Sequence, residues 1–158
     1  YYNISQTNVH AYVFGEHGDS SFIPWSVANI SNVPITDCRK LITTPGITTP
    51  ELDFEEIEQY VRKSGGRVIQ RKGATFYAVS VSVCHICKCL LCGIDTTMTV
   101  STMMHGEYGI DDVCLSVLNL VGDNGVRGKI NVSLTDEEVN LLRKSADTLK
   151  EVISNLEI

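Results

Sequence analysis

A histidine framed by glycines and carboxylates stands close to the start of this chain. The stretch YVFGEHGDSSFIPWS, residues 12–26, places His17 between Gly15-Glu16 and Gly18-Asp19. An imidazole with an unperturbed pKa of about 6.5 can give or take a proton at neutral pH, and so can act as a general acid or base. A plain surface loop also explains the glycines and charges. His17 is nevertheless the residue here with acid–base chemistry to offer.

Cysteines form the second group with chemical potential. Cys84, Cys87, Cys89 and Cys92 have a spacing that superficially resembles a zinc site. Zinc ribbons, however, separate their two Cys pairs by about a dozen residues or more, whereas Lys88 alone separates them here. If the stretch is a helix, with about 100° per residue, Cys89 and Cys92 point about 140° away from the first pair. We therefore expect no metal and a buried helix in which cysteine serves as a small hydrophobic residue. A zinc-binding module is the remote alternative.

Length and composition indicate one ordinary globular domain. The chain has 158 residues, 43% of them hydrophobic and 20% charged, which is typical of a folded protein rather than a disordered one. A net charge of −6 and the lack of a Lys/Arg stripe argue against a nucleic-acid partner. No segment has the length and apolarity of a membrane span. With 158 residues to form a core, the chain does not need disulfides, so free thiols and a cytoplasmic location are expected.

The start of the sequence predicts a piece of a longer protein. YYNISQTN has neither the charged nor the apolar region of a signal peptide, and no initiator Met precedes it. We expect no leader at this point, and an excised domain or fragment; a processed mature chain is the other possibility.

The first half of the chain predicts one strand and two helices. Residues 9–14, VHAYVF, are typical of a strand that runs into the Gly15 turn. Residues 24–33 predict a short helix and then a loop. Thr49 followed by Pro50 predicts the start of a long helix, in which two consecutive glycines at 65–66 indicate a bend or a close neighbour. Its apolar residues recur at helical spacing on one face: Phe54, Ile57, Val61, Val68 and Ile69.

The second half predicts a hairpin between two helices. Residues 75–92 are almost free of charge and read as the buried helix named above. A strand is expected over TTMTVSTMM, and the GDNG turn between CLSVLNLV and VRGKINVSL predicts a β-hairpin. Residues 135–138 form a capping box before a terminal amphipathic helix. Its apolar stripe comprises Val139, Leu142, Ala146, Leu149, Val152, Ile153 and Leu156. The predicted fold class is α+β, an antiparallel sheet packed with helices.

Phosphate-binding and nucleophile motifs are missing from the sequence. Gly122, Gly125 and Gly128 do not have the GxGxxG spacing, and a strand rather than a helix follows them. No P-loop and no GxSxG elbow occurs. The chain therefore lacks the loop that would hold the phosphates of a nucleotide.

Five stretches resemble the L-lactate dehydrogenases of bacterial type. VHAYVFGEHGDSSFIPWSVANISNVPI is similar to their active-site segment, with its GEHGD motif followed by a Ser/Thr, a PxWS-type stretch and a VP tail. RKGATFYA, MMHGEYGIDDV, NGVRGKINVSLTDEE and SADTLKEV continue the resemblance in the order of the family. GEHGD together with RKGAT is specific. The cysteine-rich stretch departs from the family, whose members have few cysteines there.

The resemblance implies roles for four residues. His17 matches the proton donor, which as an imidazolium hydrogen-bonds the substrate carbonyl. Thr75 of RKGAT matches a threonine that lines the substrate pocket, although a helix cap is its plainer interpretation. Val79 matches a position near the nicotinamide and is equally a plausible core residue. His10 matches the histidine that in many bacterial members helps to bind fructose 1,6-bisphosphate at a subunit interface.

The resemblance further implies that residues 1–158 are the C-terminal substrate-binding domain, without the preceding Rossmann half. NAD would be bound mainly by that half, which also carries the aspartate that orients the catalytic histidine and the arginine that clamps the substrate carboxylate. The expected reaction interconverts pyruvate and L-lactate in glycolysis or fermentation, with self-association to a dimer or tetramer. None of the arginines matches the clamp: Arg39, Arg62, Arg67, Arg71, Arg127 and Arg143.

Three alternatives remain open. A malate dehydrogenase or a branched 2-hydroxyacid dehydrogenase shares the fold, and the loop that selects the substrate side chain precedes this sequence. The chain by itself, expected to be inactive, could also act as an association module that buries surface against its own copies.

Overall fold

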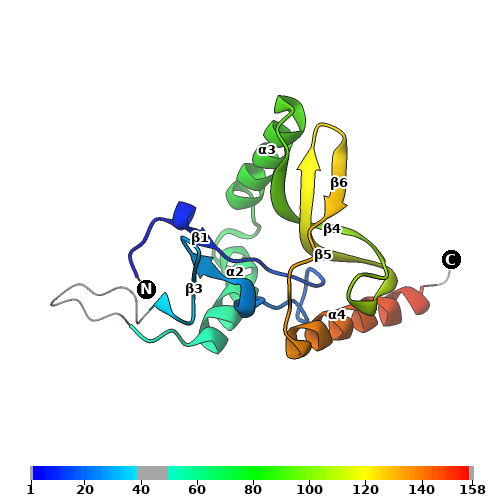
Figure 1. The fold of residues 1–158 in the computed structure, drawn as a ribbon, viewed down its shortest axis with the longest axis horizontal. Coiled ribbons are helices and arrows are strands. Elements are labelled where there is room, and N and C mark those ends of the chain that lie inside the picture. The colour runs from blue at the N-terminus through cyan, green and yellow to red at the C-terminus, as the bar shows by residue number, and fades with distance from the viewer. Residues whose placement is uncertain (1, 39–49, 157–158) are drawn as a thin grey trace.

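The computed structural model describes residues 2–38 and 50–156, which form two small antiparallel sheets and three long helices (Figure 1). The long helices are α2 (Phe54–Lys72), α3 (Tyr77–Cys92) and α4 (Asp136–Ser154). One sheet has the order β1–β2–β3, made of Val9–His10, Asn29–Ile30 and Val33–Pro34. The other has the order β4–β5–β6, made of Thr96–His105, Asp111–Gly122 and Gly125–Lys129. Three short 3-10 turns are η1 (Gln6–Asn8), η2 (Trp25–Val27) and η3 (Glu107–Gly109).

The larger sheet confirms the predicted strand and hairpin. β4 pairs with β5 from Thr96 opposite Val121 to His105 opposite Asp111, and β6 returns after the two-residue Asp123-Asn124 turn. Asn119 is fully buried in β5, and its side-chain amide donates to the carbonyls of Val100 and Val117. A buried polar group needs such partners, so the sheet carries it without an unpaired donor.

The main core lies between this sheet and α4. Phe14, Met104, Leu115 and Leu142 are fully buried there. The predicted capping box begins α4: Thr135 Oγ1 accepts from the Glu138 amide, and the Glu138 carboxylate accepts from the Thr135 amide. The predicted stripe is buried only over the first part of α4. The residues at its far end are exposed: Val152, Ile153 and Leu156.

The start of the chain folds with less regular structure than predicted. Only Val9–His10 of the expected 9–14 strand forms a strand, and Phe14 makes an isolated bridge to Phe22. The short helix expected after Pro24 forms as the 3-10 helix η2, but β2 and β3 follow it where a loop was expected. Trp25 packs on Phe54 of α2 with ring centroids 4.5 Å apart, which ties the small sheet to that helix.

α2 is confirmed as a helix, but its predicted start is wrong, and the described residues place no close neighbour at its two glycines. The helix begins at Phe54, because the Asp53 carboxylate caps the Glu56 amide at 2.9 Å. Thr49, the expected cap, lies outside the described residues, and Pro50 precedes the helix. Gly65 and Gly66 lie in a continuous run of helix, and a Cβ added to either would meet nothing within 4 Å.

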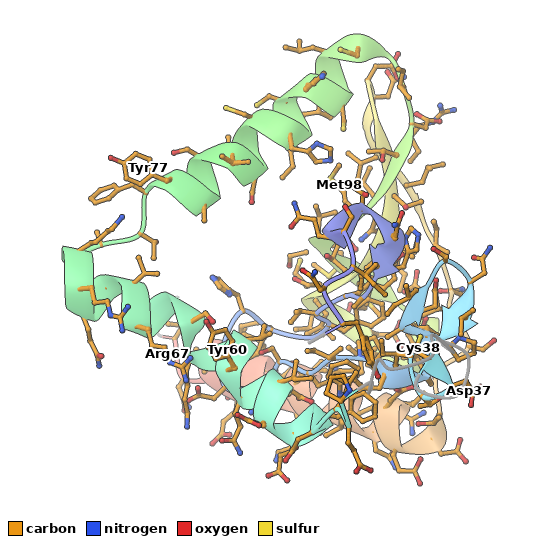
Figure 2. All side chains as sticks on the ribbon, turned by 90° about the vertical axis from the view of Figure 1, so that its left-hand side faces the viewer. Asp37, Cys38, Tyr60, Arg67, Tyr77 and Met98 are labelled. Carbon is orange, nitrogen blue, oxygen red and sulfur yellow. The ribbon has the colours of Figure 1, made fainter. Side chains whose placement is uncertain are left out.

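α3 is confirmed as a helix, but its predicted burial is wrong. Not one of its residues is buried; Tyr77 is 75% exposed and Leu91 85%. Figure 2 shows α3 running from the corner with α2 toward the start of β4, with its first turns away from both sheets. Ile86, Cys89 and Leu90 in its second half are half-buried. The apolar run predicts a helix correctly, but burial also needs a covering element, which the described residues supply only in part. Among them, no helix is both long and apolar enough to cross a membrane.

Candidate active-site loop around His17

Two pairs of backbone hydrogen bonds anchor the loop that carries His17. Phe14 and Phe22 exchange amide and carbonyl bonds of 2.9 and 3.1 Å, and both rings are buried in the core. Gly15 exchanges a second pair, of 3.0 and 2.9 Å, with Ser116 of β5. The predicted turn at Gly15 is thereby joined to the larger sheet, and His17 is the second residue after this junction.

Gly15 has no room for a side chain. Its φ of +98° belongs to backbone that side chains rarely allow, and an added Cβ would lie 2.6 Å from Ser145 Oγ and 3.2 Å from Ser145 Cβ. Ser145 is fully buried on α4 and cannot move aside freely. The first glycine of GEHGD therefore permits the close approach of the loop to α4.

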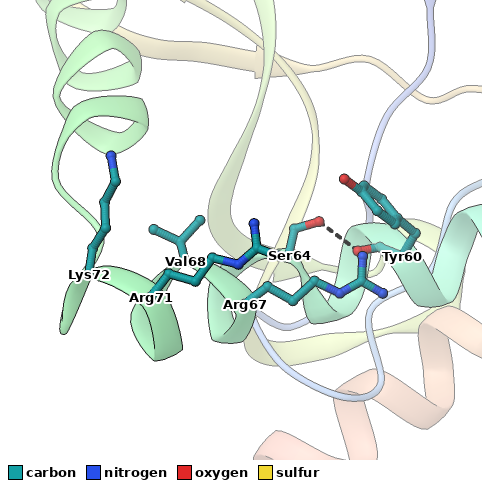
Figure 3. Close-up of a pocket in the computed structure, with 6 residues that line it drawn as sticks. All are labelled: Tyr60, Ser64, Arg67, Val68, Arg71 and Lys72. Carbon is teal, nitrogen blue, oxygen red and sulfur yellow. Dashed lines mark hydrogen bonds between the residues drawn. The ribbon is translucent and has the colours of Figure 1, made fainter.

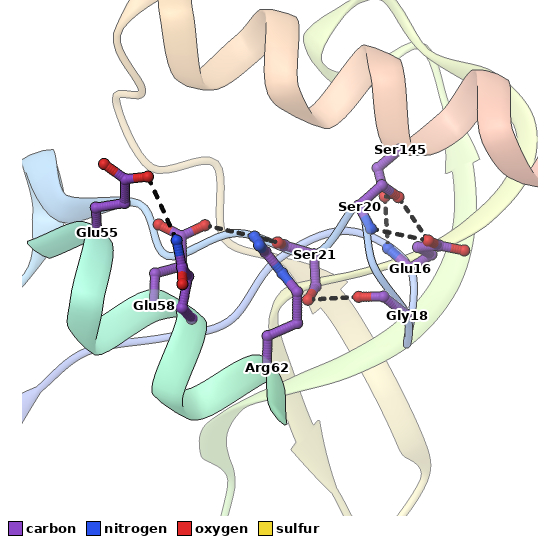
Figure 4. A network of polar contacts seen from close by, with 9 residues as sticks. Glu16, Gly18, Ser20, Ser21, Glu55, Glu58, Arg62 and Ser145 are labelled. Carbon is purple, nitrogen blue, oxygen red and sulfur yellow. Dashed lines mark hydrogen bonds and ion pairs between the residues drawn. The ribbon is translucent and has the colours of Figure 1, made fainter. Parts of the chain in front are cut away.

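A compact polar network fixes the loop from the inside (Figure 4). Ser145 Oγ accepts from the Glu16 amide at 2.7 Å and lies 3.0 Å from Ser20 Oγ, within hydrogen-bonding distance. Glu16 Oε1 accepts from both the amide and the hydroxyl of Ser20, at 3.0 and 2.7 Å. The side chains on either side of His17 are thus held by one another and by α4, which limits the positions of the histidine backbone.

A second contact holds the loop from α2. Arg62 Nη2 donates to the Ser21 carbonyl at 2.6 Å and pairs with Glu58 at 2.9 Å, so the guanidinium links helix and loop. His17 is exposed and lines a cavity of about 380 Å³ between the loop and α2. The other residues that line this cavity are Val13, Gly18, Asp19, Ser21, Val61, Arg62 and Gly65. The arrangement presents an imidazole and a guanidinium to one space large enough for a small organic acid.

The other predicted site residues lie apart from this cavity. Thr75 is exposed in the turn between α2 and α3, and Val79 is 51% exposed on the first turn of α3. His10 is exposed on β1, an outer strand of the small sheet. None of the three lines the His17 cavity. The described residues therefore assemble the His17 loop and Arg62, and leave Thr75, Val79 and His10 at separate places on the surface.

The sequence does not predict two residues that hold the site. Arg62 matches no clamp of the family, and Ser145 stands within a stretch that resembles it without a role of its own. Their contacts join residues 41 and 129 positions apart, to Ser21 and Glu16 respectively. The i,i+4 spacing of Glu58 and Arg62 predicts an ion pair on a helix, but not the third partner across the fold.

A larger cavity of about 500 Å³ lies along the second half of α2 (Figure 3). Its lining residues all come from that helix: Tyr60, Ser64, Arg67, Val68, Arg71 and Lys72. The Arg67 guanidinium stacks 4.3 Å from the centroid of the Tyr60 ring, and the Ser64 hydroxyl donates to the Tyr60 carbonyl. These residues supply positive charge but neither an imidazole nor a carboxylate, the side chains that most often act as general acids or bases.

The described residues do not contain a complete cofactor or metal site. No group of three or more His, Cys, Asp or Glu side chains within them could hold a metal ion. A dinucleotide needs a glycine-rich loop between a strand and a helix for its phosphates, and no described loop has that form.

Comparison with known proteins places the chain in a family. Residues 1–157 match the model of the lactate/malate dehydrogenase, alpha/beta C-terminal domain. An L-lactate dehydrogenase of Acetivibrio thermocellus is 39% identical over 98% of this chain and 48% of the relative. L-lactate dehydrogenase 2 of Clostridium acetobutylicum is 38% identical over 98% and 47%. The chain belongs to the lactate/malate dehydrogenase C-terminal domain family, and it spans about half the length of the curated relatives it matches.

Solved structures agree with this assignment. An L-lactate dehydrogenase from Clostridium thermocellum superposes with a TM-score of 0.84 at 35% identity, over 98% of this chain and 49% of the other. A malate dehydrogenase from Archaeoglobus fulgidus, in complex with NADH, gives 0.78 at 32% identity, over 94% and 44%. The sequence-based resemblance and the α+β fold of this domain are thereby confirmed.

Proposed function

We propose that residues 1–158 are the C-terminal, substrate-binding half of an NAD-dependent L-lactate dehydrogenase that interconverts pyruvate and L-lactate. The observation that carries the proposal is the His17 loop, which is fixed by Gly15, Glu16 and Ser20 while His17 itself faces a cavity. A rigid support and an open, titratable imidazole are what a general acid needs. A cavity of about 380 Å³ has room for pyruvate.

His17 would act as the proton donor in pyruvate reduction. As an imidazolium it donates a hydrogen bond to the substrate carbonyl oxygen, polarises the carbonyl and transfers its proton as the alkoxide develops. Proton transfer of this kind is typically worth about 10²–10⁴ in rate. NADH, when bound, supplies the hydride that reaches the carbonyl carbon. In the reverse direction His17 takes the proton from the lactate hydroxyl.

Thr75 and Val79 have supporting roles in this proposal. Both are exposed, Thr75 at the corner of α2 and α3 and Val79 on the first turn of α3. On the resemblance to the family we assign the Thr75 hydroxyl to the wall of the substrate pocket and the Val79 side chain to an apolar contact with the nicotinamide. Neither residue lines the His17 cavity in this half, so both contacts would need the longer protein. His10, exposed on an outer strand, is available to an anionic activator such as fructose 1,6-bisphosphate.

Activity is expected from the longer protein rather than from this half. α3 exposes apolar side chains along its length, including Val81 at 70% and Leu91 at 85%. A contiguous apolar surface of this kind marks an interface. The described residues also lack the phosphate loop and the carboxylate that would orient His17. We therefore propose that the Rossmann half binds NAD and that the assembled enzyme is a cytoplasmic homo-oligomer in glycolysis or fermentation.

Malate dehydrogenase is the second candidate, because a malate dehydrogenase is among the structural relatives. A branched 2-hydroxyacid dehydrogenase would use the same acid–base residue. The three differ in the side chain of the 2-oxo acid, not in the chemistry at His17.

A substrate panel separates these candidates. NADH oxidation by the longer protein is measured with pyruvate, oxaloacetate and a branched 2-oxo acid at equal concentrations. Highest kcat/KM with pyruvate supports the proposal. A higher kcat/KM with oxaloacetate or with the branched acid supports the dehydrogenase reaction but shows that pyruvate is not the preferred substrate. No NADH oxidation with any 2-oxo acid refutes the dehydrogenase assignment.

A further inference from the structure

We propose that Glu16 is a positioning residue for His17, and that its carboxylate acts as a hydrogen-bond acceptor that closes the loop around the histidine. Glu16 does not line the cavity, so the residue is assigned to the placement of His17 and not to contact with the substrate. The inference rests on the proposed function, because the group that is positioned is the proposed proton donor. It goes further by giving the carboxylate beside the histidine in GEHGD a task that the proposed reaction does not assign.

Two hydrogen bonds to one carboxylate oxygen close the loop. Glu16 Oε1 accepts from the Ser20 amide at 3.0 Å and from the Ser20 hydroxyl at 2.7 Å. The three residues between Glu16 and Ser20 are His17, Gly18 and Asp19, and all three line the cavity. Because the bonds join the residues on either side of this segment, they restrict the backbone conformations that it can adopt. The part of the loop that faces the cavity is therefore the part that the carboxylate encloses.

Gly18 leaves the space that the carboxylate occupies. An added Cβ at Gly18 would lie 2.9 Å from Glu16 Oε1 and 3.1 Å from Glu16 Cδ, both closer than ordinary van der Waals contact. The carboxylate is thus packed against the backbone of the loop, and a side chain at residue 18 would displace it from Ser20. The second glycine of GEHGD therefore makes room for Glu16, as Gly15 makes room for the approach to α4.

A buried atom of α4 holds both ends of this hydrogen-bonded ring (Figure 4). Ser145 Oγ accepts from the Glu16 amide at 2.7 Å and lies 3.0 Å from Ser20 Oγ, and Ser145 is fully buried. His17 is thereby placed relative to α4, which packs on the main core. A displacement of a catalytic group by about 1 Å can cost about 100-fold in rate, so the loss of this placement has a measurable kinetic effect.

Glu107 provides the matched control for Glu16. It is partly buried like Glu16, and its carboxylate also accepts a backbone amide close in the sequence, that of His105 at 2.6 Å. Glu107 lies in η3 and does not line the cavity. Its replacement therefore measures the general effect of deleting a hydrogen-bonded carboxylate at a turn, without a change beside His17.

The first test measures kcat and KM for pyruvate with NADH in the longer protein that contains this chain. Glu16→Ala should lower kcat about 10–100-fold, with a smaller change in KM, because the proton donor is displaced from the reacting carbonyl. Glu16→Gln retains Oε1 as an acceptor and should exceed the kcat of Glu16→Ala at least about fivefold, whereas Glu107→Ala should keep the natural kcat. An unchanged kcat in Glu16→Ala overturns the proposal. A kcat of Glu16→Gln as low as that of Glu16→Ala also overturns it, because the negative charge and not the acceptor would then be required.

Hydrogen exchange of the Ser20 amide in the same proteins supplies a readout that needs no turnover. Glu16→Ala should speed exchange at this amide by about tenfold or more, and Glu16→Gln by less than about threefold. The Ser116 amide, which donates to the Gly15 carbonyl at 2.9 Å, is the internal reference and should be unchanged. Equal exchange at Ser20 in Glu16→Ala and in the natural protein overturns the proposal. A natural protein that oxidises no NADH with any 2-oxo acid, while Ser20 exchanges as predicted, overturns the proposed function instead.

Discussion

Gly15→Ala is expected to be among the most damaging single substitutions in the His17 loop. The backbone there has φ of +98°, which costs a residue with a side chain about 1–3 kcal/mol. The new Cβ would also lie 2.6 Å from Ser145 Oγ and 3.2 Å from Ser145 Cβ, and overpacking against a fully buried residue costs about 1–3 kcal/mol more. The sum, about 2–6 kcal/mol, is a large share of the stability of a typical domain.

A double-mutant cycle separates the two contributions. Ser145→Gly removes both atoms that the added Cβ would meet, so only the backbone strain should remain. Urea unfolding should give Gly15→Ala a smaller cost in the Ser145→Gly background than in the natural protein, by about 1–3 kcal/mol. Gly128→Ala is the matched control, because a Cβ there meets nothing within 4 Å, and it should change stability by less than about 0.5 kcal/mol. An identical cost of Gly15→Ala in both backgrounds would refute the close-approach explanation.

Three further substitutions test individual contacts. Thr135→Ala removes the cap of α4 and should lower the free energy of unfolding by about 1 kcal/mol in urea titrations, whereas an unchanged midpoint would contradict the capping assignment. Gly66→Ala should stabilise the helix α2 by about 0.5–1 kcal/mol, measured as a higher Tm, because an added Cβ meets nothing within 4 Å. A lower Tm would show that this position requires a glycine. The His105 amide and the Lys129 ammonium lower the pKa of Glu107 from 4.5 to about 2. Because the folded state holds this pKa down, the stabilisation is complete above pH 4.5 and is lost as the pH falls toward 2. Glu107→Gln should therefore reduce the fall of Tm between pH 4.5 and pH 2. The same fall of Tm in the variant and in the natural protein would contradict this assignment.

The parts of the fold that the sequence predicts well are those with local causes. The β5–β6 hairpin follows from alternating apolar residues around a two-residue turn, and α4 follows from a capping box whose two hydrogen bonds span three residues. α2 shows where local reasoning fails. Thr49-Pro50 has the residue types of a helix start, but the Asp53 carboxylate sets the start of the helix.

Burial could not be predicted in the same way. The 75–92 stretch is apolar enough for a core helix, yet whether a helix is covered depends on elements outside it. The chain spans about half the length of its relatives, and α3 exposes Tyr77, Val81 and Leu91 among the described residues. Periodicity and composition describe the helix itself, so they do not tell whether another element packs against it.

The candidate site divides along the same line. His17 is recognisable from five consecutive residues, because the glycines and the histidine are local. Ser145 on α4 and Arg62 on α2 hold its loop. They lie 129 and 41 residues along the chain from the loop residues that they contact. Contacts over such separations arise only when the whole domain folds.

The central claim, that His17 is the proton donor, is tested most directly by His17→Asn in the longer protein. The measured quantity is kcat/KM for NADH oxidation with pyruvate, in the absence of any activator. The matched control is His10→Asn, because His10 is exposed like His17 but does not line the cavity. His17→Asn should lower kcat/KM by about 10²–10⁴ with little change in Tm, while His10→Asn keeps the natural rate. If His17→Asn kept the kcat/KM of the unsubstituted protein, the result would contradict this role of His17, and the GEHGD stretch would be only a structural turn.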